Sequence, residues 1–267
     1  METRDLIDIA REAAQAAADV HRSRLGTVPP EAWSEKSTAD FVTAVDHEAQ
    51  DRILEVLHRR APHHDIMAEE SGAEQDRNGS DWLWIVDPLD GTTNYLHGYP
   101  AYAASVAVTR RGRLMAGAVI DSARDHVWTA THGGGAFLDG APVHVSRIDR
   151  LSHALIGTGF PFKATHLLPR YLRQFDQVLR HTTGIRRAGA AALDLCHLAA
   201  GYFDGFWELW LAPWDIAAGT LIAREAGARV TTLGGDEDLL RDDGEATAVL
   251  AGNPAIHEAL GALVSPI

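Results

Sequence analysis

Apolar residues recur at helical spacing in two stretches near the N-terminus, residues 3–25 and residues 43–60. Steps of three and four residues between apolar positions are typical of a helix that buries one face. Pro62 ends the second stretch, because proline cannot continue a helical hydrogen-bond ladder. We therefore expect two amphipathic helices, with inward positions Leu6, Ile9, Ala10, Ala13, Ala17 and Val20 in the first and Val45, Ile53, Val56 and Leu57 in the second.

Apolar or alternating runs then predict β-strands in the rest of the first half. These runs are residues 82–86, 103–109, 114–120 and 126–131. Arg-Gly, Asp-Gly and Gly-Gly pairs punctuate them, as expected for tight turns. The first half is therefore predicted to contain a largely antiparallel sheet.

The second half changes to an alternation of short strands and helices, which implies a sheet covered by helices. We expect strands at residues 154–159, 184–189, 203–210, 228–233 and 248–253, and helices at residues 165–181, 190–200, 213–227 and 254–264. A boundary near residue 150 would give an N-terminal α+β half, residues 1–150, and a C-terminal α/β half, residues 151–267.

Composition places the chain among ordinary globular proteins, with 46% apolar and 23% charged residues in 267. The net charge of −13 argues against sequence-independent nucleic-acid binding, which needs a basic face. No apolar run reaches the length of a membrane span, and the N-terminus is an amphipathic helix rather than a signal peptide. We therefore expect a cytoplasmic protein with no nucleic-acid or membrane partner. The single cysteine, Cys196, excludes an internal disulfide.

The segment WIVDPLDGTTN, residues 84–94, ends a predicted strand with two carboxylates three positions apart. One interpretation is a tight hairpin, since Asp-Gly pairs favour such turns. The other is that Asp87 and Asp90 enter one polar pocket, beside an anion site formed by the backbone N–H groups and hydroxyls of Gly91, Thr92 and Thr93. Carboxylates beside an anion site require a cation between them.

Further acids could complete such a cation site, although each also has a structural interpretation. Glu69 and Glu70 could form a solvated acidic turn, and in an extended segment only one of them could enter a shared pocket. Asp46 lies in the first turn of the second helix, where the helix dipole favours a negative charge. Asp215 is at the expected N-cap position of the helix at residues 213–227.

Oxygen ligands without histidine or cysteine at ligand spacing suit a hard ion such as Mg²⁺, with Mn²⁺ as the alternative. Two such ions roughly 3.5–4 Å apart would clamp the attacking and leaving oxygens of an in-line displacement. Asp90 is the natural bridging carboxylate, because it is nearest the expected anion site.

The spaced set Asp46, Ala68-Glu-Glu-Ser71, Asp87-Pro-Leu-Asp-Gly-Thr-Thr-Asn94 and Trp214-Asp-Ile-Ala-Ala-Gly219 resembles the inositol monophosphatase family of lithium-sensitive, magnesium-dependent phosphatases. The resemblance extends from residue 42 to residue 253. It implies the layered α/β/α/β/α sandwich that this family shares with the fructose-1,6-bisphosphatases, an α/β (α+β) fold, and a homodimer. The N-terminal half would then contain the metal-binding motif, and the C-terminal half would complete the active site.

The resemblance also implies a role for each matching residue. Glu69, Asp87 and the Leu89 carbonyl would hold the first Mg²⁺, Asp90 would bridge to a second, and Asp215 would complete the second site, with a weaker third ion at Glu69. Thr92 and Asp46 would orient and help deprotonate the attacking water, so the catalytic set is Asp46, Glu69 and Thr92. The substrate-binding positions would be Asp90, Gly91, Thr92, Gly189, Ala191, Glu208 and Asp215.

The function implied is hydrolysis of a small polyol phosphate, with inositol 1-phosphate first, by direct attack of a metal-activated water. Histidinol phosphate, fructose 1,6-bisphosphate and phosphoadenosine phosphate remain alternative substrates, and Arg186 or Arg187 could bind a second anion. A metal-stabilised binding module without catalysis is the alternative from another class. An acyl hydrolase is disfavoured, because His132-Gly-Gly-Gly135 lacks an accompanying Gly-x-Ser-x-Gly motif.

Overall fold

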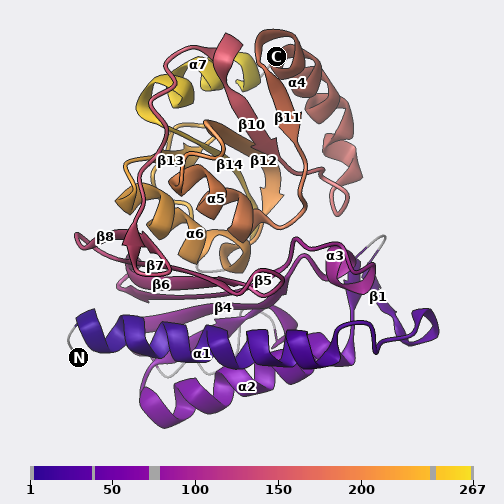
Figure 1. Ribbon diagram of the computed structural model, residues 1–267, viewed down its shortest axis with the longest axis vertical. Coiled ribbons are helices and arrows are strands. Elements are labelled where there is room, and N and C mark those ends of the chain that lie inside the picture. The colour runs from indigo at the N-terminus through magenta and orange to yellow at the C-terminus, as the bar shows by residue number, and fades with distance from the viewer. Residues whose placement is uncertain (1–2, 38–39, 72–78, 241–244, 266–267) are drawn as a thin grey trace.

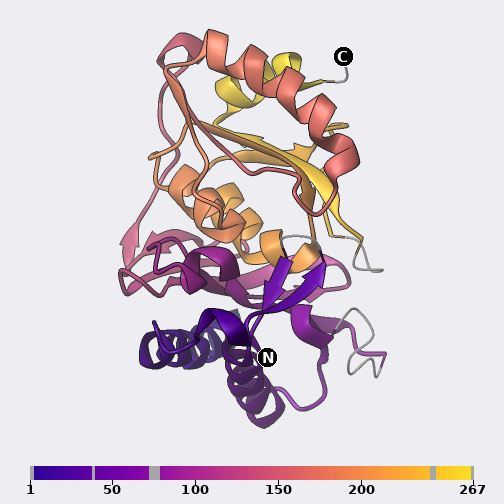
Figure 2. The same cartoon turned by 90° about the vertical axis from the view of Figure 1, so that its right-hand side faces the viewer.

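The computed structural model describes residues 3–37, 40–71, 79–240 and 245–265. Two larger sheets and the helices around them form five layers, in the order helices, sheet, helices, sheet, helices (Figures 1 and 2). The predicted α/β/α/β/α sandwich is therefore confirmed.

The first sheet has seven strands in the order β3-β4-β5-β6-β7-β8-β9. Only the β3–β4 pair is parallel, so the prediction of a largely antiparallel sheet is confirmed. The strands are β3 (Asp65–Ala68), β4 (Trp82–Asp90), β5 (Ala103–Arg110), β6 (Arg113–Asp121), β7 (His126–Thr131), β8 (Gly135–Leu138) and β9 (Ala141–Pro142).

Two helices cover the outer face of this sheet, α1 (Thr3–Arg24) and α2 (Ala44–Arg60), as Figure 1 shows. Both agree closely with the predicted amphipathic helices, and every predicted inward position is buried. Their apolar faces pack on Trp84, Val86, Val106 and Ile120 of the sheet.

The second sheet has five strands in the mixed order β11-β10-β12-β14-β13. The strands are β10 (Leu155–Thr158), β11 (Gly184–Arg186), β12 (Gly205–Leu211), β13 (Arg229–Thr232) and β14 (Thr247–Gly252). Helices α4 (Leu168–His181) and α7 (Pro254–Val264) lie on its outer face, and α5 (Ala191–Ala199) and α6 (Pro213–Glu225) lie between the two sheets (Figure 1).

Small residues allow the two central helices to pack closely. A Cβ on Gly219 of α6 would lie 2.8 Å from the Leu195 side chain of α5, and a Cβ on Gly117 of β6 would lie 3.1 Å from the Ala218 Cα of α6. A contact below about 3 Å is a clash, so Gly219 in particular sets the α5–α6 separation. The two central helices are thereby packed closely against each other and against the first sheet.

Short elements account for most of what the pattern did not predict. They are the pair β1 (Ser34–Ser37) and β2 (Asp40–Val42), the helix α3 (Thr92–Leu96), the edge strands β8 and β9, and 3₁₀ turns at Pro30–Ala32, Glu69–Ser71, Leu151–His153 and Thr165–Leu167. The chain passes from the first sheet to the second between Pro142 and Leu155. The division at residue 150 stays a prediction, because α5 and α6 follow it in sequence yet also pack on the first sheet.

No helix in the described ranges is both long enough and apolar enough to cross a membrane.

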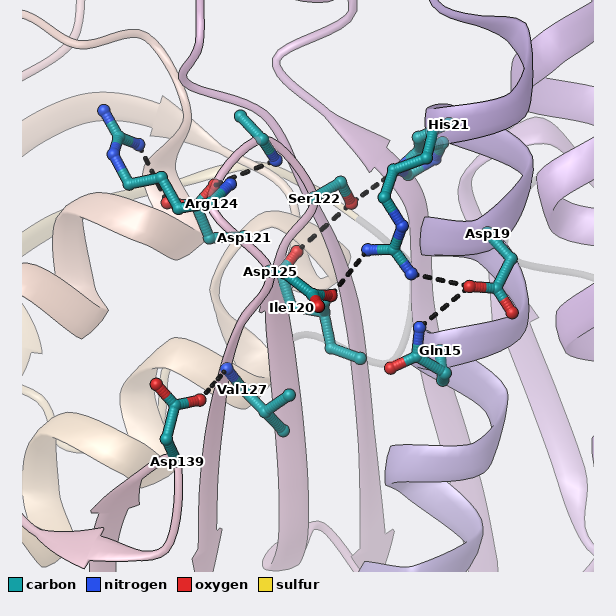
Figure 3. Close-up of polar contacts among 12 residues, drawn as sticks. Gln15, Asp19, His21, Ile120, Asp121, Ser122, Arg124, Asp125, Val127 and Asp139 are labelled. Atoms are coloured by element: carbon teal, nitrogen blue, oxygen red, sulfur yellow. Dashed lines mark hydrogen bonds and ion pairs between the residues drawn. The ribbon is translucent and has the colours of Figure 1, made fainter.

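His21 lies at the junction between α1 and the first sheet, where its side chain is fully buried. Its Nδ1 is 2.9 Å from Ser122 Oγ at the end of β6, a contact drawn in Figure 3. The Tyr95 hydroxyl donates to the His21 carbonyl at 2.9 Å. Burial lowers the pKa of the His21 imidazole to about 4, because charging it in this apolar setting is unfavourable.

We expect the free energy of unfolding to fall as the pH is lowered from about 6.5 to about 4. The unfolded chain binds a proton at His21 near its ordinary pKa of about 6.5, whereas the folded protein does so only near 4, so stability is full above this window and is lost through it. At about 1.4 kcal/mol per pKa unit, the loss is at most about 3.5 kcal/mol. Urea unfolding of wild type and His21→Asn at pH 7, 5.5 and 4.5 should give a shallower pH dependence for the variant. An equal slope in both would contradict the assignment, and His63→Asn, at an exposed position, is the control.

Candidate active site

A pocket of about 800 Å³ opens where the C-terminal end of β4 meets α3, the beginnings of α5 and α6, and the end of β12. The loop at residues 159–163 lines one side of it. Ten of the eleven residues proposed for the site from the sequence line this pocket: Glu69, Asp87, Leu89, Asp90, Gly91, Thr92, Gly189, Ala191, Glu208 and Asp215. The eleventh, Asp46, reaches it through Thr92.

The end of β4 places Asp87 and Asp90 in the pocket wall, and both are buried. The strand pairing with β5 shifts register between these two residues, and Leu89 N donates to Asp87 Oδ1 at 3.0 Å. This irregularity lets two carboxylates three positions apart reach the same pocket. The alternative of a tight hairpin is wrong, because Asp90-Gly91 leads into α3.

Gly91 is the N-cap of α3 and has a left-handed backbone with φ of +87°. A Cβ here would lie 2.7 Å from the Ala101 carbonyl oxygen, so both the conformation and the space require glycine. The turn places Thr92 and Thr93 directly after the strand's carboxylates.

Thr92, Asp46 and Thr43 form a hydrogen-bonded chain from the pocket into the protein. The Thr92 hydroxyl is 2.9 Å from Asp46 Oδ1 and 3.1 Å from the Leu89 carbonyl, and its single proton serves one of them at a time. Asp46 Oδ2 accepts from the N–H and hydroxyl of Thr43, the N-cap of α2, at 2.9 and 2.7 Å. Asp46 is thus both a capping residue and the partner of Thr92, so the two interpretations of this acid are compatible.

Glu69 and Glu70 lie in a 3₁₀ turn and not in an extended segment, because β3 ends at Ala68. Glu70 N donates to Gln50 Oε1 at 3.0 Å, which fixes the turn to α2. Glu69 lines the pocket, and its Oε1 lies 4.0 Å from Lys163 Nζ.

Asp90 and Asp215 each accept a hydrogen bond from the backbone near a helix N-terminus. Asp90 Oδ2 accepts from Ala192 N of α5 at 2.8 Å, and Asp215 Oδ2 accepts from Ala212 N at 2.7 Å. The N-cap prediction for Asp215 is wrong: the N-cap is Ala212, Pro213 is the first helical residue, and Asp215 is the third. Proline is favoured at that first position, where its missing N–H costs nothing.

Burial of several carboxylates, followed by their mutual repulsion, dominates the electrostatics of the pocket. Burial, together with the nearby Glu69 charge, raises the pKa of Asp90 to about 7 and that of Asp215 to about 8, although backbone N–H groups oppose both shifts. The pKa of Asp87 is raised well above its ordinary value, first by burial and then by Glu69 and Asp90. These acids are arranged so that a positive charge among them would be strongly favoured.

The donors fit a hard divalent cation in kind, since they are carboxylates plus the Leu89 carbonyl. In the ranges that the structure covers, no group of three or more His, Cys, Asp or Glu side chains is arranged so that it could hold a metal ion as it stands. The carboxylates of Asp90 and Asp215 accept backbone hydrogen bonds there, and Glu69 faces Lys163. A bound cation would take the place of these contacts at the carboxylate oxygens that it uses.

The opposite wall contains the residues expected to contact the substrate. Glu208 on β12 is buried, and burial followed by the Asp194 charge raises its pKa well above the ordinary value. Asn94 Nδ2 donates to the carbonyls of Ala188 and Gly189 at 2.9 and 3.2 Å, which fixes the turn before α5 to α3.

Several pocket residues were absent from the proposed site. They are Asn94, Phe160, Phe162, Lys163, Trp210 and Trp214, and beside the pocket the buried Asp194, whose Oδ1 has no hydrogen-bond partner. In the sequence, Asp194 could have been noticed as a single acidic residue within the otherwise apolar segment AAALDLC, residues 190–196. Of the two arginines considered for a second anion, both are exposed, but only Arg187 is part of the pocket lining, with its guanidinium 4.9 Å from the Phe160 ring centroid.

Comparison with known proteins agrees with this geometry. "Nus factor SuhB" of Pseudomonas aeruginosa is 41% identical over 98% of this chain and 96% of its own length. "Inositol-1-monophosphatase" of Mesorhizobium japonicum is 40% identical over 96% of this chain and 94% of its own. These relatives match the chain along almost its entire length.

Solved structures show the same fold. The extragenic suppressor protein SuhB of Bartonella henselae superposes with a TM-score of 0.89 at 37% identity, covering 97% of this chain and 98% of that one. Inositol monophosphatase of Anabaena (Nostoc) gives a TM-score of 0.82 at 34% identity, covering 98% and 95%. The sequence model of the inositol monophosphatase family matches residues 2–267 of this chain. The chain therefore belongs to the inositol monophosphatase family.

Proposed function

We propose that this protein is a magnesium-dependent phosphomonoesterase that hydrolyses a small polyol phosphate, with inositol 1-phosphate as the first candidate substrate. The observation behind the proposal is that Glu69, Asp87, Asp90 and Asp215, from three separate segments, line one pocket beside the Thr92–Asp46 pair. Family membership supports the same reaction class. We expect the enzyme to act in the cytoplasm as a homodimer and to be sensitive to lithium.

In this proposal Glu69, Asp87, Asp90, Asp215 and the Leu89 carbonyl hold two or three Mg²⁺ ions, or Mn²⁺. When bound, the ions supply charge neutralisation at the phosphoryl oxygens and make the attacking water more acidic. The N–H groups of Gly91 and Thr92 hold the phosphate, and Gly189, Ala191 and Glu208 contact the hydroxyls of the leaving group.

Thr92 and Asp46 would orient the attacking water and help to deprotonate it. While the Thr92 hydroxyl donates to Asp46 Oδ1, the lone pairs of its oxygen remain available to accept a proton from water at the pocket. Asp46 is held by Thr43 through two bonds to its other oxygen, so its orientation is fixed before substrate binds. Phosphoryl transfer depends mainly on such positioning and on charge neutralisation, and no covalent phosphoenzyme is needed.

A second candidate function comes from the relatives named Nus factor, the first of which is 41% identical over 98% of this chain. The name suggests that association with RNA polymerase should be tested in addition to catalysis. Such an association would not exclude contact with nucleic acid, which the net charge argued against. Size-exclusion chromatography with purified bacterial RNA polymerase is the direct test, and co-elution would support this role.

The substrate and the metal are tested together by phosphate release. We expect Mg²⁺-dependent release from a generic aryl phosphate and a higher kcat/KM for inositol 1-phosphate than for histidinol phosphate, fructose 1,6-bisphosphate or phosphoadenosine phosphate. Metal binding without turnover of any phosphomonoester would favour the non-catalytic module instead.

Asp90→Asn should lower kcat/KM by about 100-fold or more while the fold is kept, since the amide remains an acceptor for Ala192 N but loses the charge that a bridging ion needs. Steady-state kinetics and circular dichroism provide the measurement. Asp176→Asn, which removes an exposed carboxylate of α4, is the matched control. Turnover above a tenth of wild type would exclude Asp90 as the bridge.

Thr92→Val should reduce kcat by about 100-fold, because it removes the hydroxyl that links Asp46 to the pocket and leaves the shape nearly unchanged. Thr183→Val is the matched control, since Thr183 is exposed and lies outside the pocket lining. Similar kcat values for the two variants would argue against a role for Thr92 in proton transfer.

A further inference from the structure

Lys163 places a positive charge in a pocket otherwise dominated by carboxylates. Its Nζ is 4.0 Å from Glu69 Oε1, and its side chain is 34% exposed, so the ammonium is accessible from the pocket opening. The same ammonium opposes the effect of burial on the pKa of both Asp90 and Asp215. Lys163 therefore lies close to Glu69, and its charge also acts on Asp90 and Asp215.

The loop that contains Lys163 is fitted closely against the opposite wall of the pocket. At Gly159 a Cβ would lie about 2.1 Å from Glu208 Oε1, so glycine allows the backbone to approach this buried carboxylate. Phe160 and Phe162 lie 4.9 and 5.9 Å from the Arg187 guanidinium. The loop thus joins the wall at Glu208 and Arg187 to Glu69 on the other side.

The charge of the occupied pocket differs from that of the empty one. Two divalent cations would balance the charge of four ionised carboxylates. Glu69 would then be paired with a cation instead of with the Lys163 ammonium. A phosphate monoester then adds about two negative charges at the same place. When the cations and the phosphate are bound, the Lys163 ammonium can therefore pair with the phosphoryl group instead of with Glu69.

Resting on the proposed function, we propose that Lys163 is a substrate-binding residue that moves its ion pair from Glu69 to the phosphoryl group once the cations are bound. Its flexible four-carbon stem permits this short movement without a change in the sheets. The Arg187 guanidinium, by contrast, lies over the Phe160 and Phe162 rings, at 4.9 and 5.9 Å from their centroids. The ammonium adds a charge-assisted hydrogen bond to those of the backbone N–H groups.

Titration calorimetry with inorganic phosphate, in the presence of saturating Mg²⁺, tests this inference without turnover. We expect Lys163→Gln to weaken phosphate binding by about tenfold and Lys163→Arg to restore most of the loss. Mg²⁺ binding without phosphate should be unchanged or tighter in Lys163→Gln, since a competing cation has been removed. The matched control is Arg186→Gln, which removes an exposed positive charge just outside the pocket.

Equal phosphate affinity in wild type and Lys163→Gln would overturn the inference and leave the proposed function standing. A loss of phosphate binding of the same size in Arg186→Gln would also overturn it, because a general charge effect would then suffice. Wild type that binds Mg²⁺ but neither binds phosphate nor releases it from any ester would refute the proposed function, and this inference with it.

Discussion

The burial of several carboxylates in one pocket, where they also repel one another, is the constraint around which this molecule is organised. Asp87, Asp90 and Asp215 are packed into one pocket with Glu69, and three of these acids have a raised pKa because burial and their neighbours disfavour the charged form. Such crowding lowers stability unless something positive is bound there. The rest of the fold supplies enough apolar burial to tolerate this arrangement, and the protein can thereby keep a site prepared for cations.

The arrangement also explains why both halves of the chain are needed. Asp90, from the first sheet, accepts a hydrogen bond from Ala192 at the beginning of α5, and Asp215 comes from the beginning of α6. Both helices lie between the sheets, and the N-terminus of α5 directs the Ala192 N–H at Asp90 of β4, while the Ala212 N–H at the beginning of α6 holds Asp215. The positions of the acids therefore depend on the packing of the central layer as well as on local sequence.

Local pattern was sufficient for the features that depend on neighbours in sequence. The spacing of apolar residues predicted α1 and α2 almost to their ends, and Asp87, Asp90 and Gly91 indicated a strand end followed by a turn. The Trp-Asp and Asp-Pro-Leu-Asp motifs, taken with the family resemblance, predicted the layered fold. The 3₁₀ turn at Glu69 and the third-residue position of Asp215 were missed, because local backbone geometry is decided by Gln50 and Pro213 respectively. Lys163 was missed because the role proposed for it depends on its proximity to Glu69, which lies 94 positions earlier in the chain.

The close contact of Gly219 with Leu195, and of Gly117 with Ala218, has a consequence for how this architecture can be recombined. A chimera that joins the first half of this chain to the second half of a relative would pack the first sheet of one protein against the α5 and α6 helices of the other. The sizes of the contacting residues would then not be matched. An alanine in place of either glycine on one side would require a smaller neighbour on the other. Crossover points placed between the two sheets would therefore succeed only when both parents share this pattern of small residues, and exchange of a whole outer helix is the safer design.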